Sequence, residues 1–408
     1  MMKKVLTFIM AGGKGERLWP LTKDRTKPAV PFGGIYRIID FTLSNCINSG
    51  LRRVYILTQY KSASLHRHIR LGWNIMSSEL GEYIEILPAQ QRVSETWYLG
   101  TADAIYQNLY TLEMDKPDEV LILAGDHVYK MNYYTMIDFH RYMNADLTVS
   151  VVEVNKDQSN QLGVVEVDDK GKLIGFQEKP SDPKTIPGNQ THICASMGIY
   201  IFKHGVLEEE LHEDSKRQNS SHDFGKDIIP QMLKKKRNIA VFNFSQRSRK
   251  EGNHWRDIGT MDAYYEANMD LVRVDPTFNL YEKDWPIRTY QEQFPPANTV
   301  FSGDETTGRV GLFLDSLVAG GCIISGGRVQ RSILSPNVRV NSFCEIYDSI
   351  LMEGVNVGRY AKIKRAIIDK DVNIPPGMVI GYNPDEDKKR FEISKSGIVV
   401  VAKGTEIK

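Results

Sequence analysis

A glycine-rich segment near the start of the chain is the first candidate for chemistry. It reads Ala11-Gly12-Gly13-Lys14-Gly15-Glu16-Arg17, and Lys27 comes ten residues after Arg17. Glycines let the backbone approach a phosphate with its N–H groups turned inward, and two cations beyond them suit a leaving pyrophosphate. The segment lacks the Lys-Ser/Thr pair of a P-loop and the third glycine of a dinucleotide fingerprint. A helix cap followed by solvated basic residues is the alternative.

Two aspartates are candidates for holding a divalent cation. The apolar run 121–124 leads into Gly125-Asp126, which places a carboxylate at the carboxyl edge of a sheet, where a hard cation is held against a nucleotide phosphate. Mg²⁺ takes one or two carboxylates besides phosphate oxygens, and Asp257 offers a second. No local argument brings the two together, because 131 residues separate them. For Asp126, capping of the following helix is the alternative.

The pair Glu178-Lys179 ends a strand-like run and is a candidate for binding a phosphorylated sugar. A carboxylate accepts hydrogen bonds from sugar hydroxyls and an ammonium binds a phosphate, although an exposed ion pair is the more common role of such neighbours. His192 and Cys194 lie close in sequence, but two further ligands for zinc are missing.

The composition excludes several classes of protein. A length of 408 residues predicts two or three domains, and 52 basic against 51 acidic residues leave no overall basic footprint for nucleic acid or an anionic membrane. No apolar run approaches the roughly 18 residues that span a bilayer. The cysteines are far apart, which predicts reduced thiols in a cytoplasmic protein. They are Cys46, Cys194, Cys322 and Cys344.

The first two-thirds of the chain alternates strand-like and helix-like segments. Short apolar runs such as 5–10 and 120–124 are typical of strands buried on both faces, and apolar residues recur at helical spacing over 101–112. Residues 164–176 predict a hairpin around an Asp/Gly turn. This alternation predicts a doubly wound α/β domain with ligands beyond the carboxyl ends of its strands. The first run also resembles a signal peptide, but its shortness favours a strand.

The last part of the chain carries small apolar residues at a regular spacing. The intervals are 6, 6, 5, 6, 6, 5 and 6, so Ile333, Ile350 and Ile367 fall 17 residues apart. This period predicts a β-helix of stacked coils, whereas a sandwich of hairpins is the alternative. No histidine follows Cys322, which counts against acyl transfer. The apolar positions are Val338, Cys344, Ile350, Val355, Ala361, Ile367, Val372 and Met378.

Together these features resemble the sugar nucleotidyltransferases, and most closely their bacterial branch that transfers adenylyl from ATP to glucose 1-phosphate. The resemblance implies a Rossmann-like α/β domain with a mostly parallel sheet (1–275), a linker (276–300) that the aromatic residues predict to be packed, and a left-handed parallel β-helix (301–408) for regulation and oligomerisation. The motifs that carry it are Lys27–Val30, Phe32–Gly34, Tyr36–Phe41, Leu43–Gly50, Pro88–Arg92, Trp97–Tyr98, Gly100–Asp103 and Ser220–Gly225.

The resemblance also implies an activity and assigns residues to it. Glucose 1-phosphate would attack the α-phosphorus of ATP in line, with Mg²⁺ and no covalent enzyme intermediate, to give pyrophosphate and ADP-glucose for glycogen synthesis. Arg17, Lys27 and Asp126 would be catalytic, and Asp126 and Asp257 would hold the metal. Glucose 1-phosphate would be bound by Tyr98, Gly163, Glu178, Lys179 and Ser196, and the nucleotide by Gly12, Gly13, Gly15, Gln90, Gly100 and Thr101.

Family members are homotetramers or heterotetramers under allosteric control by anionic metabolites, and the resemblance implies the same here, with no nucleic-acid or membrane partner. Arg25 is a candidate effector contact, but Asp24 replaces a lysine that enterobacterial relatives use, and it would repel an anionic activator. Use of UTP, dTTP or GTP and a non-catalytic regulatory subunit remain alternatives. The presence of Lys27, Asp126 and Lys179 favours a catalyst.

Overall fold

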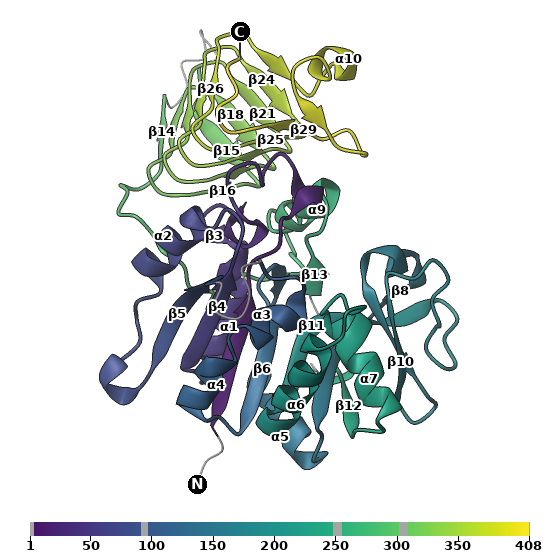
Figure 1. The fold of residues 1–408 in the computed structure, drawn as a ribbon. Coiled ribbons are helices and arrows are strands. Elements are labelled where there is room, and N and C mark those ends of the chain that lie inside the picture. The colour runs from purple at the N-terminus through teal and green to yellow at the C-terminus, as the bar shows by residue number, and fades with distance from the viewer. Residues whose placement is uncertain (1–3, 91–96, 248–254, 302–308, 408) are drawn as a thin grey trace. The chain divides into compact units, whose positions relative to one another are not determined.

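The computed structural model describes residues 4–90, 97–247, 255–301 and 309–407, and its chain divides into two compact units (Figure 1). Unit 1 comprises residues 1–13, 42–62 and 73–255, and unit 2 comprises residues 14–41, 63–72 and 256–408. No helix in the described part of the chain is long and apolar enough to cross a bilayer. All four cysteines are buried free thiols, as expected.

Unit 1 is built on a nine-stranded mixed sheet. Its parallel part has the order β6 (Glu119–Ala124), β1 (Val5–Met10), β4 (Arg53–Thr58) and β5 (Tyr83–Pro88). The long β11 (His192–Lys203) runs antiparallel to β6. The first apolar run is therefore a central strand, and the signal-peptide interpretation is wrong. The remaining strands are β8 (Leu147–Asn155), β9 (Gly163–Val167), β10 (Leu173–Glu178) and β12 (Ile239–Asn243), of which β9 and β10 form the predicted hairpin.

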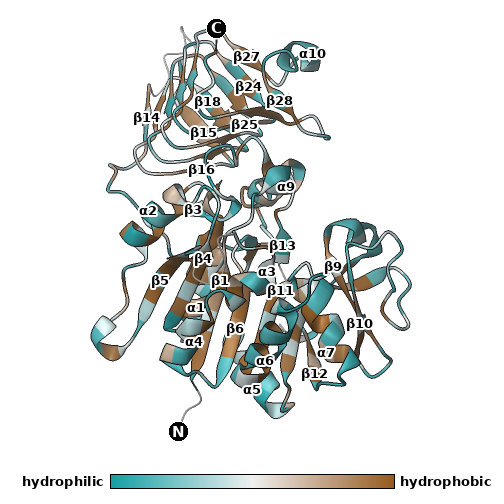
Figure 2. Ribbon diagram, in the orientation of Figure 1, coloured by the Kyte–Doolittle hydropathy of each residue, from teal (hydrophilic) through white to brown (hydrophobic). Residues whose placement is uncertain are grey.

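Helices pack on this sheet, whose central strands are hydrophobic along most of their length (Figure 2). The predicted helix over 101–112 is two helices, α3 (Thr101–Tyr106) and α4 (Leu109–Asp115). The amide of Asn108 donates to Ala104 O at 2.8 Å, and this bond competes with the helical ladder at the break. The others are α1 (Ile38–Asn48), α5 (Tyr133–Tyr142), α6 (His204–Ser215), α7 (Ile229–Lys234) and α8 (Phe244–Arg247), with the short strands β7 (His127–Tyr129) and β13 (Trp255–Asp257).

Unit 2 contains the segment predicted as a linker, and this segment is packed. Thr289 Oγ1 donates to Asp40 Oδ2 at 2.6 Å, and Tyr290 lies so close to Gly72 that a Cβ on the glycine would be 2.6 Å from Tyr290 Cβ. Tyr281 departs from the expectation, because its side chain is 76 % exposed. Unit 2 also holds β2 (Pro31–Phe32), β3 (Tyr36–Arg37), α2 (Ala63–Gly72) and α9 (Met261–Asp270).

Parallel coils, the arrangement of a left-handed β-helix, begin at β14 (Asn298–Val300), in the last residues of the predicted linker. They confirm the 17-residue period. Ile333 pairs with Ile350, and Ile350 pairs with Ile367, in three successive parallel strands. Seven of the eight predicted apolar positions are buried and Met378 is partly buried, so the hairpin-sandwich alternative is wrong. Before β29 (Val399–Val401) the chain inserts α10 (Pro384–Asp387) and β28 (Glu392–Ile393).

The coils form three sheets along the β-helix. One sheet has β14 (Asn298–Val300), β17 (Ile323–Ser325), β20 (Arg339–Val340), β23 (Asn356–Val357) and β26 (Asn373–Ile374). The second has β15 (Leu312–Leu314), β18 (Arg328–Gln330), β21 (Glu345–Tyr347), β24 (Lys362–Lys364) and β27 (Val379–Ile380). The third has β16 (Leu317–Val318), β19 (Ile333–Leu334), β22 (Ile350–Leu351) and β25 (Ala366–Ile368), and β29 and β28 complete it.

Candidate active site

Asp126 stands two residues beyond the carboxyl end of β6 in unit 1. Its side chain is 35 % exposed, and its Oδ1 lies 3.6 Å from His127 Nε2. The next helix, α5, has Asn132 as its N-cap, whose side chain accepts from Tyr134 N. The helix-cap alternative for Asp126 is therefore wrong. The carboxylate is placed at the sheet edge where open α/β sheets bind ligands.

The glycines that follow β1 lie at the same edge, because β1 and β6 are parallel neighbours with Met10 opposite Ala124. A Cβ added to Gly12 would be 3.1 Å from the Cβ of Gln59, the residue after β4. Gln59 Oε1 in turn accepts from Tyr98 N at 2.8 Å. Sequence reasoning missed Gln59, since nothing in its local sequence marks it.

Tyr98 and Thr101, which we expect to contact the sugar and the base, are held in place by hydrogen bonds within unit 1. Tyr98 OH accepts from the Asn108 amide at 3.0 Å, and burial raises the pKa of its phenol above the usual value. Thr101 Oγ1 donates to Asp223 Oδ2 at 2.9 Å. Gln90 is exposed, and Gln91 and Arg92 of its motif lie outside the described residues. Asp223, a second missed residue, is part of the motif Ser220–Gly225.

Gly163, Glu178, Lys179 and Ser196 lie on neighbouring strands of unit 1. Glu178 pairs with Gly163 across β10 and β9, and Ala195 of β11 pairs with Val164, so Ser196 and Gly163 come next along those two strands. The β11 register shifts just after Ser196, which is buried. Such bulges re-aim side chains near active sites. The four residues therefore form one group.

Glu178 and Lys179 form an ion pair, with Lys179 Nζ 3.1 Å from Glu178 Oε1. This is the more common role that the sequence left open for such neighbours. The lysine side chain is 49 % exposed, so the pair leaves it accessible to a ligand. The backbone of Lys179 has φ +50°, a left-handed conformation that residues other than glycine rarely adopt. Residues held in such conformations cluster at binding sites, which favours a role beyond a surface pair.

Unit 2 gathers two cations and a carboxylate. Lys27 Nζ lies 2.9 Å from Asp257 Oδ1, and both side chains are mostly buried. A Cβ added to Gly259 would be 2.7 Å from Asp257 Oδ2 and 3.3 Å from Arg17 Nη1. The Asp257 carboxylate and the Arg17 guanidinium therefore both lie beside this glycine. The side chain of Arg17 is exposed and accessible to an anion.

The backbone around Lys27 explains its position. Gly15 has φ +65°, and a Cβ there would be 3.1 Å from Lys27 Cβ, so the glycine allows close approach of the lysine. Thr22 Oγ1 donates to Gly15 O at 2.9 Å and closes the loop. Lys27 is buried at the start of a 3-10 turn, Lys27–Ala29, in which Pro28 fixes the backbone. The alternative is wrong for Lys27, which is buried and not solvated. Gly15 is nevertheless the N-cap of a 3-10 turn, Glu16–Leu18, and Arg17 is exposed, so the alternative holds for these two residues.

Asp126 and Asp257 have the right chemistry for a hard cation, because Mg²⁺ prefers carboxylate oxygens and accepts one or two of them with phosphate oxygens. Each is placed by its own unit, Asp126 in unit 1 and Asp257 in unit 2. Asp257 already holds an ammonium group, so its carboxylate is built to face positive charge.

Arg25, the candidate effector contact, is buried in unit 2. Its Nη2 donates to both carboxylate oxygens of Asp369, at 2.9 and 3.0 Å. The guanidinium therefore already has a carboxylate partner in this structure.

Comparison with known proteins identifies the family. Residues 6–273 match the nucleotidyl transferase family model, and residues 295–401 match the model of the GlmU-like C-terminal hexapeptide. The chain is 55 % identical over 404 residues to the glucose-1-phosphate adenylyltransferase of Koribacter versatilis, covering 98 % of this chain and 96 % of that protein. It is 51 % identical to glucose-1-phosphate adenylyltransferase 2 of Vibrio cholerae, covering 98 % of both chains. This chain belongs to the nucleotidyl transferase family and, within it, to the glucose-1-phosphate adenylyltransferases.

Proposed function

We propose that this enzyme transfers the adenylyl group of ATP to glucose 1-phosphate. A phosphate oxygen of glucose 1-phosphate attacks the α-phosphorus of ATP in line. A new P–O bond forms as the bond to the β-phosphate oxygen breaks, so that ADP-glucose and pyrophosphate are the products. Transfers of this kind need positioning and charge stabilisation rather than a covalent intermediate. The observation that carries the proposal is the mostly buried Lys27–Asp257 pair, whose charged atoms lie 2.9 Å apart. The exposed guanidinium of Arg17 lies near the same aspartate, beside Gly259.

On the nucleotide side, Lys27 and Arg17 bind the triphosphate and stabilise the leaving pyrophosphate. An ammonium that is held in place and mostly shielded from water acts more strongly on developing charge than a solvated one. Gly12, Gly13 and Gly15 let the backbone approach the phosphates. Gln90, Gly100 and Thr101 contact the base, and the bonds of Thr101 to Asp223 and Phe224 hold that part of the pocket.

On the sugar side, Lys179 binds the phosphate of glucose 1-phosphate and Glu178 accepts from the sugar hydroxyls. The bare backbone at Gly163 leaves room beside Glu178, since a Cβ there would be 3.1 Å from its Oε2. Tyr98 and Ser196 complete the contacts. Asp126 and Asp257 would hold Mg²⁺, which when bound offsets the negative charge that builds on the phosphates.

The direct test is pyrophosphate release from glucose 1-phosphate and Mg²⁺ with each of ATP, UTP, dTTP and GTP. We expect release with ATP alone. Preference for another nucleotide would overturn the adenylyl assignment and leave the nucleotidyl transfer. No release with any of the four, also after addition of anionic metabolites, would instead indicate a regulatory subunit without activity.

The wider role follows from the same assignment. ADP-glucose is the glucosyl donor for glycogen, so the enzyme would act in glycogen synthesis in the cytoplasm. We propose a homotetramer that anionic metabolites regulate, with a catalytic domain over 1–275, a linker over 276–300 and a β-helix over 301–408 for regulation and assembly. Arg25 remains the candidate effector contact, and exchange of its Asp369 partner for an anionic ligand would be the event to detect.

A further inference from the structure

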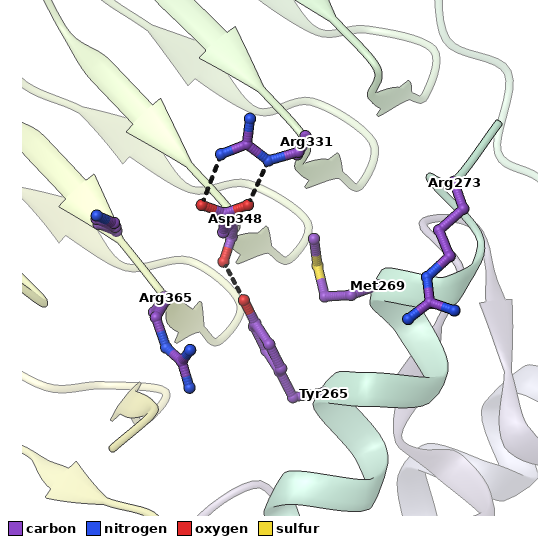
Figure 3. A pocket seen from close by; sticks show the side chains of 7 residues that line it. Tyr265, Met269, Arg273, Arg331, Asp348 and Arg365 are labelled. Atoms are coloured by element: carbon purple, nitrogen blue, oxygen red, sulfur yellow. Dashed lines mark hydrogen bonds and ion pairs between the residues drawn. The ribbon is translucent and has the colours of Figure 1, made fainter. Parts of the chain in front are cut away.

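A second group of basic residues lies in unit 2, in a pocket of about 470 Å³. One wall comes from α9, with Tyr265 and Met269, and from Arg273 just beyond it (Figure 3). The other wall comes from the β-helix, with Arg331, Asp348, Lys364 and Arg365. None of these residues belongs to the proposed active site, and neither Arg25 nor Asp369 lines the pocket.

The β-helix wall repeats one corner of the coil. Arg331, Asp348 and Arg365 follow one another at 17-residue steps, and all three have φ between +46° and +48°. Successive coils therefore stack these three side chains in a column. A left-handed backbone is unfavourable for arginine, which has neither the freedom of glycine nor the local bonding of asparagine. The column brings alternating charges to the pocket.

The charges in this pocket do not balance. Arg331 forms two bonds to Asp348, from Nε at 2.7 Å and from Nη2 at 3.0 Å, and Arg273 lies 3.1 Å from Asp270. Lys364 and Arg365 have no carboxylate partner within ion-pair distance in the described part of the chain. Arg365 Nη2 donates only to a carbonyl, Ser396 O, at 3.1 Å. Two positive charges are thus left for a ligand.

The floor of the pocket is less polar. Tyr265 is 9 % exposed, and its hydroxyl is occupied because it donates to Asp348 O at 2.6 Å. The aromatic ring and the Met269 side chain offer apolar surface to the carbon atoms of a ligand (Figure 3). A volume of this size is typical of small-molecule sites.

We propose that this pocket binds a small phosphate monoester, with Lys364 and Arg365 on the phosphate and Tyr265 and Met269 beside the organic part. A phosphate monoester carries nearly two negative charges at neutral pH, which matches the two uncompensated cations. The guanidinium of Arg365 is suited to two parallel hydrogen bonds to phosphate oxygens. Inorganic phosphate offers the same charge without the organic part. The proposal does not depend on the proposed function.

The test is titration calorimetry of the full chain with glycerol 3-phosphate and with inorganic phosphate, at constant ionic strength. The double variant Lys364→Ala with Arg365→Ala removes both uncompensated cations. Its control, Lys362→Ala with Arg339→Ala, removes the same charge from exposed β-helix positions outside the pocket. We expect the pocket variant to bind at least tenfold more weakly than the wild type and the control to bind as the wild type does.

A third variant, Lys179→Ala, separates this pocket from the proposed glucose 1-phosphate site, and we expect it to keep the binding. Unchanged affinity in the pocket variant, equal losses in the pocket and control variants, loss in Lys179→Ala alone, or no saturable binding by the wild type would each overturn the proposal. Tighter binding of inorganic phosphate than of glycerol 3-phosphate would overturn the part assigned to Tyr265 and Met269. Equal melting temperatures of the variants check that the fold is kept.

Discussion

Lys27 Nζ and Asp257 Oδ1 lie 2.9 Å apart although 230 residues separate them in sequence, and neither side chain is more than 12 % exposed. A mostly buried ion pair of this kind is strongly destabilised when one partner is removed, because an uncompensated charge stays behind. The pair therefore joins two segments of unit 2 and holds a cation in place.

We expect Lys27→Met to lower turnover at least about 100-fold, as loss of a group that stabilises a developing oxyanion does. It should also lower the free energy of unfolding by about 3 kcal/mol. The double variant with Asp257→Asn should cost less stability than the sum of the two single changes, since the charge left alone is then gone. Urea denaturation measures the stability and pyrophosphate release the turnover. Additive losses of stability would contradict the pairing.

Asp126→Asn is expected to abolish turnover and keep the fold, since the side chain is 35 % exposed and lies beyond the end of β6. The amide has nearly the same shape but lacks the charge that a cation needs. Asp138→Asn, an exposed position on α5, is the control and should keep full turnover. Pyrophosphate release over a series of Mg²⁺ concentrations measures the effect. If Asp126→Asn reached wild-type turnover at any of these Mg²⁺ concentrations, Asp126 would not be needed for catalysis.

Lys179→Ala should raise the KM for glucose 1-phosphate about tenfold or more and change the KM for ATP little. A hydrogen bond between charged groups contributes about 1.5–3 kcal/mol, which is the range of such an effect. Lys184 gives the matched control, because it is a more exposed lysine that pairs with Glu166 at 2.6 Å instead of Glu178. Steady-state kinetics with each substrate varied in turn separates the two constants. Equal KM values for both variants would contradict the assigned role.

The repeat region shows how much of the fold the sequence predicts. The coil period follows from apolar residues that each coil must bury on the next one, so Ile333, Ile350 and Ile367 could be aligned without coordinates. The helix break at Asn108 could not be predicted in this way. There the side-chain amide of Asn108 donates to Ala104 O, a carbonyl that would otherwise accept a backbone hydrogen bond of the helix. Local periodicity contains no information on that choice.

Single residues of the candidate site could be predicted from the sequence, but the contacts between distant site residues could not. The run before Asp126 places that carboxylate at a sheet edge, and the structure confirms the strand. The Lys27–Asp257 pair and the Arg25–Asp369 pair link residues 230 and 344 positions apart, which no local pattern relates. Such contacts depend on how whole elements pack, so only the fold reveals them.

Gly100→Ala and Gly205→Ala should have opposite effects on stability. A Cβ at Gly100 would be 2.3 Å from His222 O, a backbone atom that cannot easily move, so we expect a loss of at least about 2 kcal/mol together with weaker nucleotide binding. A Cβ at Gly205 in α6 meets nothing within 4 Å, and alanine in a helix gains about 0.5–1 kcal/mol over glycine. Urea denaturation gives both values. A Gly100→Ala variant that is at least as stable as the wild type would show that the space around Gly100 is not restrictive.

Tyr265 should make the stability of the protein depend on alkaline pH. Burial, followed by the charge of Asp348, raises the pKa of this phenol to about 12 from its usual value of 10. The folded state therefore keeps its proton at a pH where the unfolded chain loses it. The stabilisation by the neutral phenol is complete below pH 10 and is lost as the pH rises towards 12.

Comparison of the wild type with Tyr265→Phe isolates this contribution. At pH 8 the variant should be less stable by about 1 kcal/mol, because the bond to Asp348 O is lost. That difference should shrink above pH 10 and change sign as the pH approaches 12, with a slope below about 1.4 kcal/mol per pH unit, the limit for one proton. Tyr281→Phe, at a 76 % exposed position, should change the stability at pH 8 by less than about 0.5 kcal/mol. A Tyr265→Phe difference that stays constant up to pH 12 would show that burial does not hold the proton on this phenol.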